Sequence, residues 1–380
     1  MVRVVAVLVL IAFSLPARAG QGKDNPEFNG KKMSEWIVML KEDQAPRKRR
    51  AAALALGQIV ADHKDEKTIA AAALPPLAKA IRSDPSPVVR GQAAAILGQQ
   101  PAEQGAAFVS DLVECLRGEK DPAAKKDVAV ALGRFGPLSR PAVLALIGAL
   151  KEPDAGAKAA VADALGRIGP DAKAAASELL PLVKDKETIV RRAAIFALGR
   201  IDPDDPGPVS AALCEVMKTE KDRDLRLETV TALGLLGDRS TEAAEAIAVA
   251  LTEKDPELRK QAARSLAKLG RAAKHVAQKL KDAATSDTDK DVRLDCIHTL
   301  GVAYGAEAKD LIPFLTDRLK TDPDFEVRIG VADELGSLGP AGKDALPALR
   351  AAQTDSQIKV RAAAAAAVKQ IEKPVGKQPD

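Results

Sequence analysis

The side chains best suited to metal or nucleophilic chemistry are few and widely scattered. The chain has three histidines and three cysteines, at His63, His275, His298, Cys115, Cys214 and Cys296. Only Cys296 and His298 lie close together, and a spacing of two places them on different faces of a helix. The sequence contains no Cys-x-x-Cys pair, phosphate-binding loop, dinucleotide glycine motif or Gly-x-Ser-x-Gly element. We therefore predict no catalytic residue, no metal ligand and no cofactor, and expect the cysteines to be small core residues.

Arginine is the residue type whose spacing does indicate binding. Arg134, Arg167 and Arg200 recur at intervals of 33 residues. On stacked helices about 10 Å apart they would form a basic line ~20–30 Å long, suited to an acidic peptide or an anionic polymer. The alternative is that they only end helices, where arginine interacts favourably with the helix dipole. Phe196 and Arg264, which share another position of the same repeat, complete the candidate binding residues.

These arginines belong to a repeat that fills the chain. A basic residue, an alanine-rich apolar stretch and Leu-Gly recur ten times, 41 residues apart at first and 33–35 thereafter. The leading basic residues, which define position zero, are Arg49, Arg90, Lys125, Lys158, Arg191, Arg226, Arg259, Arg293, Arg328 and Arg361. Apolar residues recur at −1, +3 and +7, as in Val190, Ala194 and Leu198, which is one stripe of a helix.

Signals at the ends of each phrase predict where its helix begins and ends. Aspartate stands at −4 in six copies, where it is a natural N-cap: Asp121, Asp154, Asp222, Asp255, Asp289 and Asp324. The glycine after the leucine, and a Gly-Pro pair in three copies, should end the helix. A second amphipathic segment lies between phrases, and Pro181 within one should kink it. Because one pair cannot bury its apolar stripe, we predict an all-α fold, an α-solenoid of about ten helix pairs forming a right-handed superhelix.

The phrases, clearest in Leu179–Gly199 and Leu346–Arg361, resemble HEAT repeats, with Ala267 and Val368 as departures. The resemblance implies that the second helices line the concave face and that the Asp and Arg side chains form a ladder between repeats. The alanine-rich form is also similar to the bacterial HEAT-like repeats of phycobilin lyases, so an enzyme of the HEAT-like lyase or oxidoreductase families, or an accessory to one, is the alternative function. The iron sites of HEAT-like deoxyhypusine hydroxylases need His-Glu pairs, which this chain lacks.

The N-terminus is typical of an export signal. An apolar run from Val4 to Leu15 precedes Pro16 and the small-x-small pattern 17–19, so residues 1–19 are expected to be a cleaved signal peptide. An uncut membrane anchor is the alternative. We expect a flexible segment at 20–30, the solenoid at 31–371 and a disordered tail at 372–380. Trp36 either covers the end of the core or anchors a partner.

The charge balance narrows the class of partner. The chain carries 57 basic and 53 acidic residues, a net charge of +4, and the predicted mature chain +2. A near-neutral chain has no overall electrostatic reason to bind nucleic acid or an anionic membrane surface. The sequence thus predicts a monomeric, exported interaction scaffold without a stable membrane span, located in the periplasm or cell envelope or secreted. Its concave face would bind a protein or an acidic peptide.

Overall fold

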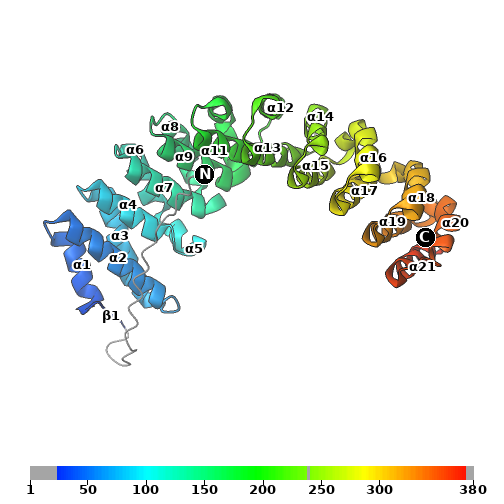
Figure 1. Ribbon diagram of the computed structural model, residues 1–380. Coiled ribbons are helices and arrows are strands. Elements are labelled where there is room, and N and C mark those ends of the chain that lie inside the picture. The colour runs from blue at the N-terminus through cyan, green and yellow to red at the C-terminus, as the bar shows by residue number, and fades with distance from the viewer. Residues whose placement is uncertain (1–23, 238–239, 374–380) are drawn as a thin grey trace, which may run out of the picture.

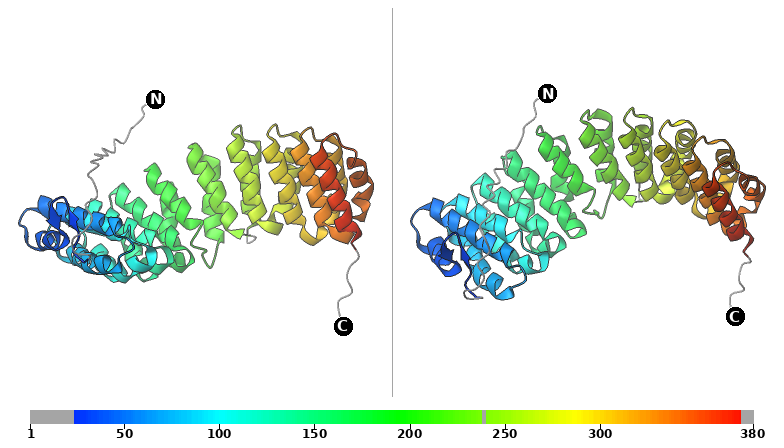
Figure 2. Two further views of the ribbon diagram at one scale, coloured as in Figure 1. Left: turned by 90° about the horizontal axis from the view of Figure 1, so that it is seen from below. Right: turned by 60° about the horizontal axis from the view of Figure 1, so that its bottom comes forward.

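The protein is an arc of stacked helix pairs. The computed structural model describes residues 24–237 and 240–373, and within them ten pairs follow one another from end to end (Figure 1). One helix of each pair belongs to an inner, concave layer and the other to an outer layer. Successive pairs stand side by side along the arc (Figure 2), as the predicted α-solenoid requires.

The helices follow the predicted phrases closely. The inner helices are α2 (Pro46–Asp62), α4 (Pro87–Leu97), α7 (Pro122–Arg134), α9 (Ala155–Ile168), α11 (Thr188–Leu198), α13 (Arg223–Leu235), α15 (Pro256–Lys268), α17 (Lys290–Tyr304), α19 (Phe325–Ser337) and α21 (Ile358–Glu372). The outer helices are α1 (Met33–Glu42), α3 (Lys67–Ser83), α6 (Val109–Gly118), α8 (Val143–Ala149), α10 (Ala176–Leu179), α12 (Gly207–Thr219), α14 (Thr241–Val249), α16 (Ala277–Ser286), α18 (Ile312–Thr321) and α20 (Leu346–Ala352), and a short extra helix, α5 (Ala102–Gly105), precedes α6.

Many outer helices are entered or left through 3₁₀ turns. These turns are η1 (Ala106–Phe108), η2 (Gly136–Ala142), η3 (Gly169–Ala175), η4 (Leu180–Lys184), η6 (Ala250–Thr252), η7 (Gly270–Val276), η8 (Gly305–Leu311) and η9 (Gly339–Ala345). Pro181 lies in η4, where α10 gives way to a 3₁₀ turn. The predicted kink is therefore confirmed, because proline cannot donate the hydrogen bond that would continue α10.

The leucine of each phrase forms the continuous core between the layers. All nine are fully buried, namely Leu56, Leu97, Leu132, Leu165, Leu198, Leu233, Leu266, Leu300 and Leu335. Val368, which replaces leucine in the last repeat, is slightly more exposed at 8%. Each pair thus completes its core only against its neighbours.

The glycine after this leucine has a different role from the one predicted. Gly133 and Gly166 lie within α7 and α9 rather than after them. A Cβ atom on Gly133 would lie 3.1 Å from Ala164 Cα, and one on Gly166 would lie 2.8 Å from Ala197 Cα. The glycine therefore lets the next inner helix approach closely. The chain leaves the helix three residues later, at glycines with positive φ such as Gly136 (φ 54°).

A ladder of ion pairs joins each repeat to the next, but with partners other than those predicted. The leading basic residues pair across nine junctions as Arg49–Asp84, Arg90–Glu119, Lys125–Glu152, Lys158–Asp185, Arg191–Glu220, Arg226–Glu253, Arg259–Asp287, Arg293–Asp322 and Arg328–Asp355. Every acid in this ladder stands at −6 of the following repeat. The six aspartates at −4 instead accept a backbone amide at the start of their own helix, as the capping prediction required.

A small hairpin covers the N-terminal end, where the sequence predicted flexibility over 20–30. Strands β1 (Glu27–Phe28) and β2 (Lys31–Lys32) pair through a turn at Asn29 and Gly30, both with positive φ. The Trp36 indole donates a 3.0 Å hydrogen bond to the Phe28 carbonyl and is only 8% exposed. Trp36 is thus part of the terminal core.

The predicted ends of the chain are only partly within the described residues. The expected signal peptide, 1–19, lies outside them, as does 374–380 of the expected tail. Glu372 still belongs to α21 and accepts a 2.7 Å hydrogen bond from Arg350. The solenoid therefore extends one residue further than predicted.

Candidate functional site

The arginine row, Arg134, Arg167 and Arg200, follows the C-terminal ends of three consecutive inner helices. Arg134 is the last residue of α7, Arg167 lies in the last turn of α9, and Arg200 follows α11. The guanidinium carbon of Arg200 lies 3.7 Å from the centroid of the Phe196 ring, and that of Arg167 lies 5.9 Å from it. The structure thus places four of the five predicted binding residues on adjacent helices, three of them around one ring.

Phe196 is held in this position by the absence of a side chain on α9. A Cβ atom on Gly166 would lie 2.8 Å from Cδ1 of the Phe196 ring. The half-buried ring therefore crosses from α11 onto α9, where both arginines reach it. Each cation–π contact at a partly exposed site contributes about 0.5–1 kcal/mol. The ring orients the guanidinium groups without removing their charge.

The three arginines differ in how far their charge is offset. Arg167 Nε donates to Asp163 Oδ2 at 2.5 Å, and Arg200 Nη1 lies 3.4 Å from Glu228 Oε1. Arg134 is exposed and has no hydrogen bond or ion pair with any residue in 24–237 or 240–373. Exposed ion pairs contribute only about 0.2–1 kcal/mol, so an incoming carboxylate can compete for these arginines.

Part of this arrangement fits the capping alternative. Arg200 Nη1 also donates to the Phe196 carbonyl at 3.1 Å, in the last turn of its own helix. Such a bond satisfies a terminal carbonyl, as expected for a basic residue at a helix C-terminus. Arg134 makes no equivalent bond within the described part of the chain, so capping does not account for the whole row.

Arg264 lies apart from the arginine row. It belongs to α15, two inner helices beyond α11, and its Nε donates to Asp295 Oδ2 on α17 at 2.8 Å. Burial raises the pKa of Asp295, and the neighbouring Arg264 partly opposes that rise. Arg264 therefore links two repeats, and the structure does not join it to the other four residues.

The sequence analysis missed the acids that contact this surface. Asp163 and Glu228 both lie on inner helices, α9 and α13, and bind arginines of the row. Asp163 stands four residues before Arg167, a spacing that places opposite charges together on one helix. That signal was visible in the sequence, whereas the contact between Glu228 and Arg200 requires knowledge of how neighbouring helices dock.

The histidines and cysteines do not assemble into a reactive centre. Among the described residues, no group of three or more His, Cys, Asp or Glu side chains is placed to hold a metal ion. Burial raises the pKa of the Cys115 thiol to about 11 and also raises that of Cys296. His298 Nδ1 lies 2.9 Å from Glu334 Oε1, across one junction between repeats. The two buried thiols therefore stay protonated, as expected of core residues.

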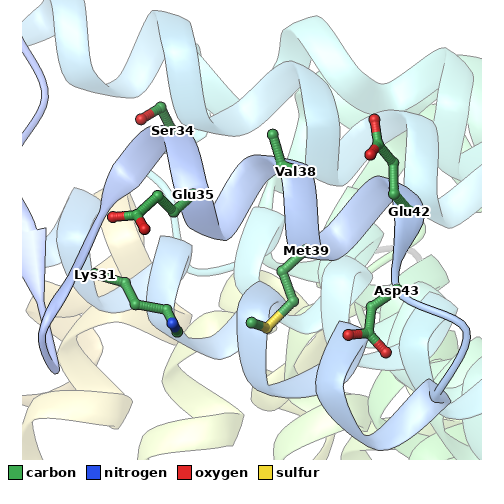
Figure 3. A pocket seen from close by; sticks show the side chains of 7 residues that line it. All are labelled: Lys31, Ser34, Glu35, Val38, Met39, Glu42 and Asp43. Atoms are coloured by element: carbon green, nitrogen blue, oxygen red, sulfur yellow. The ribbon is translucent and has the colours of Figure 1, made fainter.

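The largest hollows do not gather chemical groups either. A cavity of about 530 Å³ lies along α1 (Figure 3), with Val38 and Met39 among its apolar lining. Its polar residues maintain local structure, since Ser34 bonds to the segment before the hairpin and Glu35 accepts the Lys32 amide. A second, more apolar hollow of about 780 Å³ lies between α12 and α14 and includes Cys214, whose thiol pKa is raised by burial.

Comparisons with known proteins assign the chain to a family. The family model described as HEAT repeats matches residues 74–147, 143–211, 210–301 and 312–379, and the model described as a HEAT-like repeat matches residues 46–99. These matches span well over half of the chain, so the protein belongs to the HEAT repeat family. The more specific likeness to phycobilin-lyase repeats stays a prediction. No curated protein matches the chain.

A solved structure supports the same fold. The chain is similar to the crystal structure of an engineered protein, a Northeast Structural Genomics Consortium target, with 21% sequence identity and a TM-score of 0.61. The match covers 90% of this chain and 99% of that chain. At this identity the likeness concerns the fold alone. None of the helices in the described residues is both long enough and apolar enough to cross a membrane.

Proposed function

We propose that the protein is an interaction scaffold whose concave layer binds an acidic segment of a partner protein at the arginine row. HEAT repeats generally mediate protein interactions, which supports the class of function. The observation that carries the more specific proposal is the arrangement of Arg134, Arg167 and Arg200 at the ends of three adjacent inner helices, two of them stacked around Phe196. Guanidinium groups bind carboxylates through paired hydrogen bonds, so a row of them favours a row of acids.

The electrostatics favour a local rather than a general attraction. A net charge of +4 on 380 residues is too small to draw in polyanions over the whole surface. The recognition we propose therefore depends on the row itself, and nucleic acid and anionic membranes are not its partners. We propose that the scaffold acts as a monomer.

The binding test compares two triple variants of equal charge change. Arg134, Arg167 and Arg200 are replaced by Glu in one, and the exposed Arg117, Lys151 and Lys184 in the other. The control residues belong to the outer helices, or to the turn after one, of the same three repeats. The probe is a fluorescein-labelled peptide of ten glutamates, and fluorescence anisotropy measures its affinity.

We expect the arginine-row variant to weaken binding at least about tenfold, because three exposed ion pairs together contribute roughly 1–3 kcal/mol. The control variant should bind as the unaltered protein does. Equal affinity in the two triple variants would remove the arginine row from the function. Capture from an envelope extract with the same two variants extends the comparison to natural partners.

We also propose that the protein is exported to the periplasm or cell envelope, or secreted. The apolar run Val4–Leu15 and the small-x-small pattern that follows it support this. N-terminal sequencing of the protein recovered from the envelope or medium of expressing cells should begin at Gly20. Recovery only from the cytoplasm, with Met1 retained, would overturn export.

A further inference from the structure

The arginine row is part of a longer line of exposed side chains. Position +9 is occupied next by Leu235, Lys268 and Val302, at the ends or in the last turns of α13, α15 and α17. Leu235 is 41% exposed and Val302 40%, although each is apolar. Lys268 is exposed and has no ion pair with the described residues. We call Arg134, Arg167, Arg200, Leu235, Lys268 and Val302 the six-residue stripe.

The stripe repeats at the distance between packed helices. The inner helices α7, α9, α11, α13, α15 and α17 contact one another in order, and packed helices lie about 8–10 Å apart. A polyproline II chain has three residues per turn and rises about 3.1 Å per residue, so equivalent side chains recur every ~9.3 Å. Side chains on one face of a β-strand recur every ~6.6 Å, and the turns of an α-helix every ~5.4 Å. Only the polyproline II spacing matches one repeat of the scaffold.

Resting on the proposed function, we infer that the partner segment is a polyproline II chain that presents one side chain to each repeat. Its contact residues stand three apart and follow the stripe as acid, acid, acid, apolar, acid, apolar. Charge complementarity to Arg134, Arg167, Arg200 and Lys268 fixes the acids. The exposed Leu235 and Val302 fix the apolar positions, since covering them removes apolar surface from water. A polyproline II chain has no internal hydrogen bonds, so it can follow the bend of the concave layer (Figure 1).

The first experiment tests the spacing with synthetic peptides. The matched peptide has 16 residues, with Glu at positions 1, 4, 7 and 13, Leu at 10 and 16, and Pro or Ala elsewhere. Its reversed-order twin is included because a chain can run along the stripe in either direction. The control has the same composition, with its glutamates at every second position.

We expect one of the two matched peptides to bind at least about tenfold more tightly than the control, by fluorescence anisotropy at constant salt. A control that binds as tightly as the better matched peptide overturns the inference. If all peptides then lose affinity equally in the triple arginine-row variant, the proposed function stands without the spacing rule. If none responds to that variant, both proposals fall.

The second experiment tests the apolar part of the stripe. The double variant Leu235→Ser, Val302→Ser should weaken the better matched peptide several-fold and leave the peptide truncated to its three clustered acidic contacts unchanged. The double variant Leu144→Ser, Val249→Ser is the control, because these residues are 75% and 55% exposed on outer helices. Equal weakening by the two double variants, or none by either, would remove Leu235 and Val302 from the binding surface.

Discussion

Phe196 and Gly166 show how a single missing side chain positions a binding surface. The ring of Phe196 occupies space that any Cβ atom on Gly166 would enter, and it places Arg200 3.7 Å away. The same glycine allows Ala197 of the next inner helix to approach. Packing of the solenoid and orientation of the arginine row therefore depend on one residue.

Replacing Gly166 by Ala should destabilise the protein by about 1–3 kcal/mol, because the new methyl group meets the backbone at Ala197 as well as the ring. Alanine normally stabilises a helix interior by about 0.5–1 kcal/mol over glycine. Gly148→Ala is the matched control, since nothing lies within 4 Å of its would-be Cβ atom in α8. Urea unfolding should thus give opposite signs for the two variants, and a stabilised Gly166→Ala protein would contradict the close approach.

At the scale of the element, the ladder of ion pairs ties each inner helix to the turn before the next. Arg293 and Asp322 form one such pair with both side chains buried, joined by two hydrogen bonds of 2.8 and 2.9 Å. Hydrogen bonding from Asp322 raises the pKa of Arg293, against the opposing effect of burial. Breaking a buried pair leaves an uncompensated charge, so the ladder fixes how consecutive repeats dock.

The ladder predicts a loss of stability in acid. Arg328 holds the pKa of Asp355 below its usual value, and the backbone amide of Asp222 is the main cause of a lowered pKa at Glu220. In the unfolded chain such carboxyls titrate near pH ~4. Their stabilising effect is therefore complete above that pH and is lost as the pH falls through the lower, folded values.

Urea midpoints should stay nearly constant between pH 7 and 5 and fall below about pH 4. In Asp355→Asn the decline should be smaller than in the exposed control Asp344→Asn, because one titrating partner is gone. Identical pH profiles for these two variants would show that the Arg328–Asp355 pair does not couple to folding.

Some elements were predictable from the sequence and others were not. The period of the leading basic residue and the buried leucine, as in Arg191 and Leu198, was enough to predict every inner helix. The ladder acids were visible too, since an acid stands six residues before each basic residue, but the aspartates at −4 were an equally regular choice. The turn at Asn29-Gly30 carries a recognised hairpin signal that was passed over. The role of Gly166 could not be predicted, because it depends on a helix that approaches from the next repeat.

At the scale of the whole molecule, the two ends differ from every internal junction. Glycine stands at +8 in eight repeats, but the last repeat has the exposed Lys369 there. At the other end the hairpin packs against α2, where Ala55 is only 3% exposed. Both end faces are thus poorly suited to stacking on another copy of the chain, which supports the monomeric state proposed for the scaffold.

The ladder also has two unmatched termini, Asp43 before the first rung and Arg361 after the last. Asp43 turns to Lys48, and Arg361 donates only to the Asp355 and Ser356 carbonyls. Every rung between them joins a base to an acid in the same order, so all the joints are interchangeable. A gene that duplicated or lost one 33-residue unit would still encode matching joints. The reach of the molecule can therefore change in whole steps, leaving the chemistry that locks its units together unaltered.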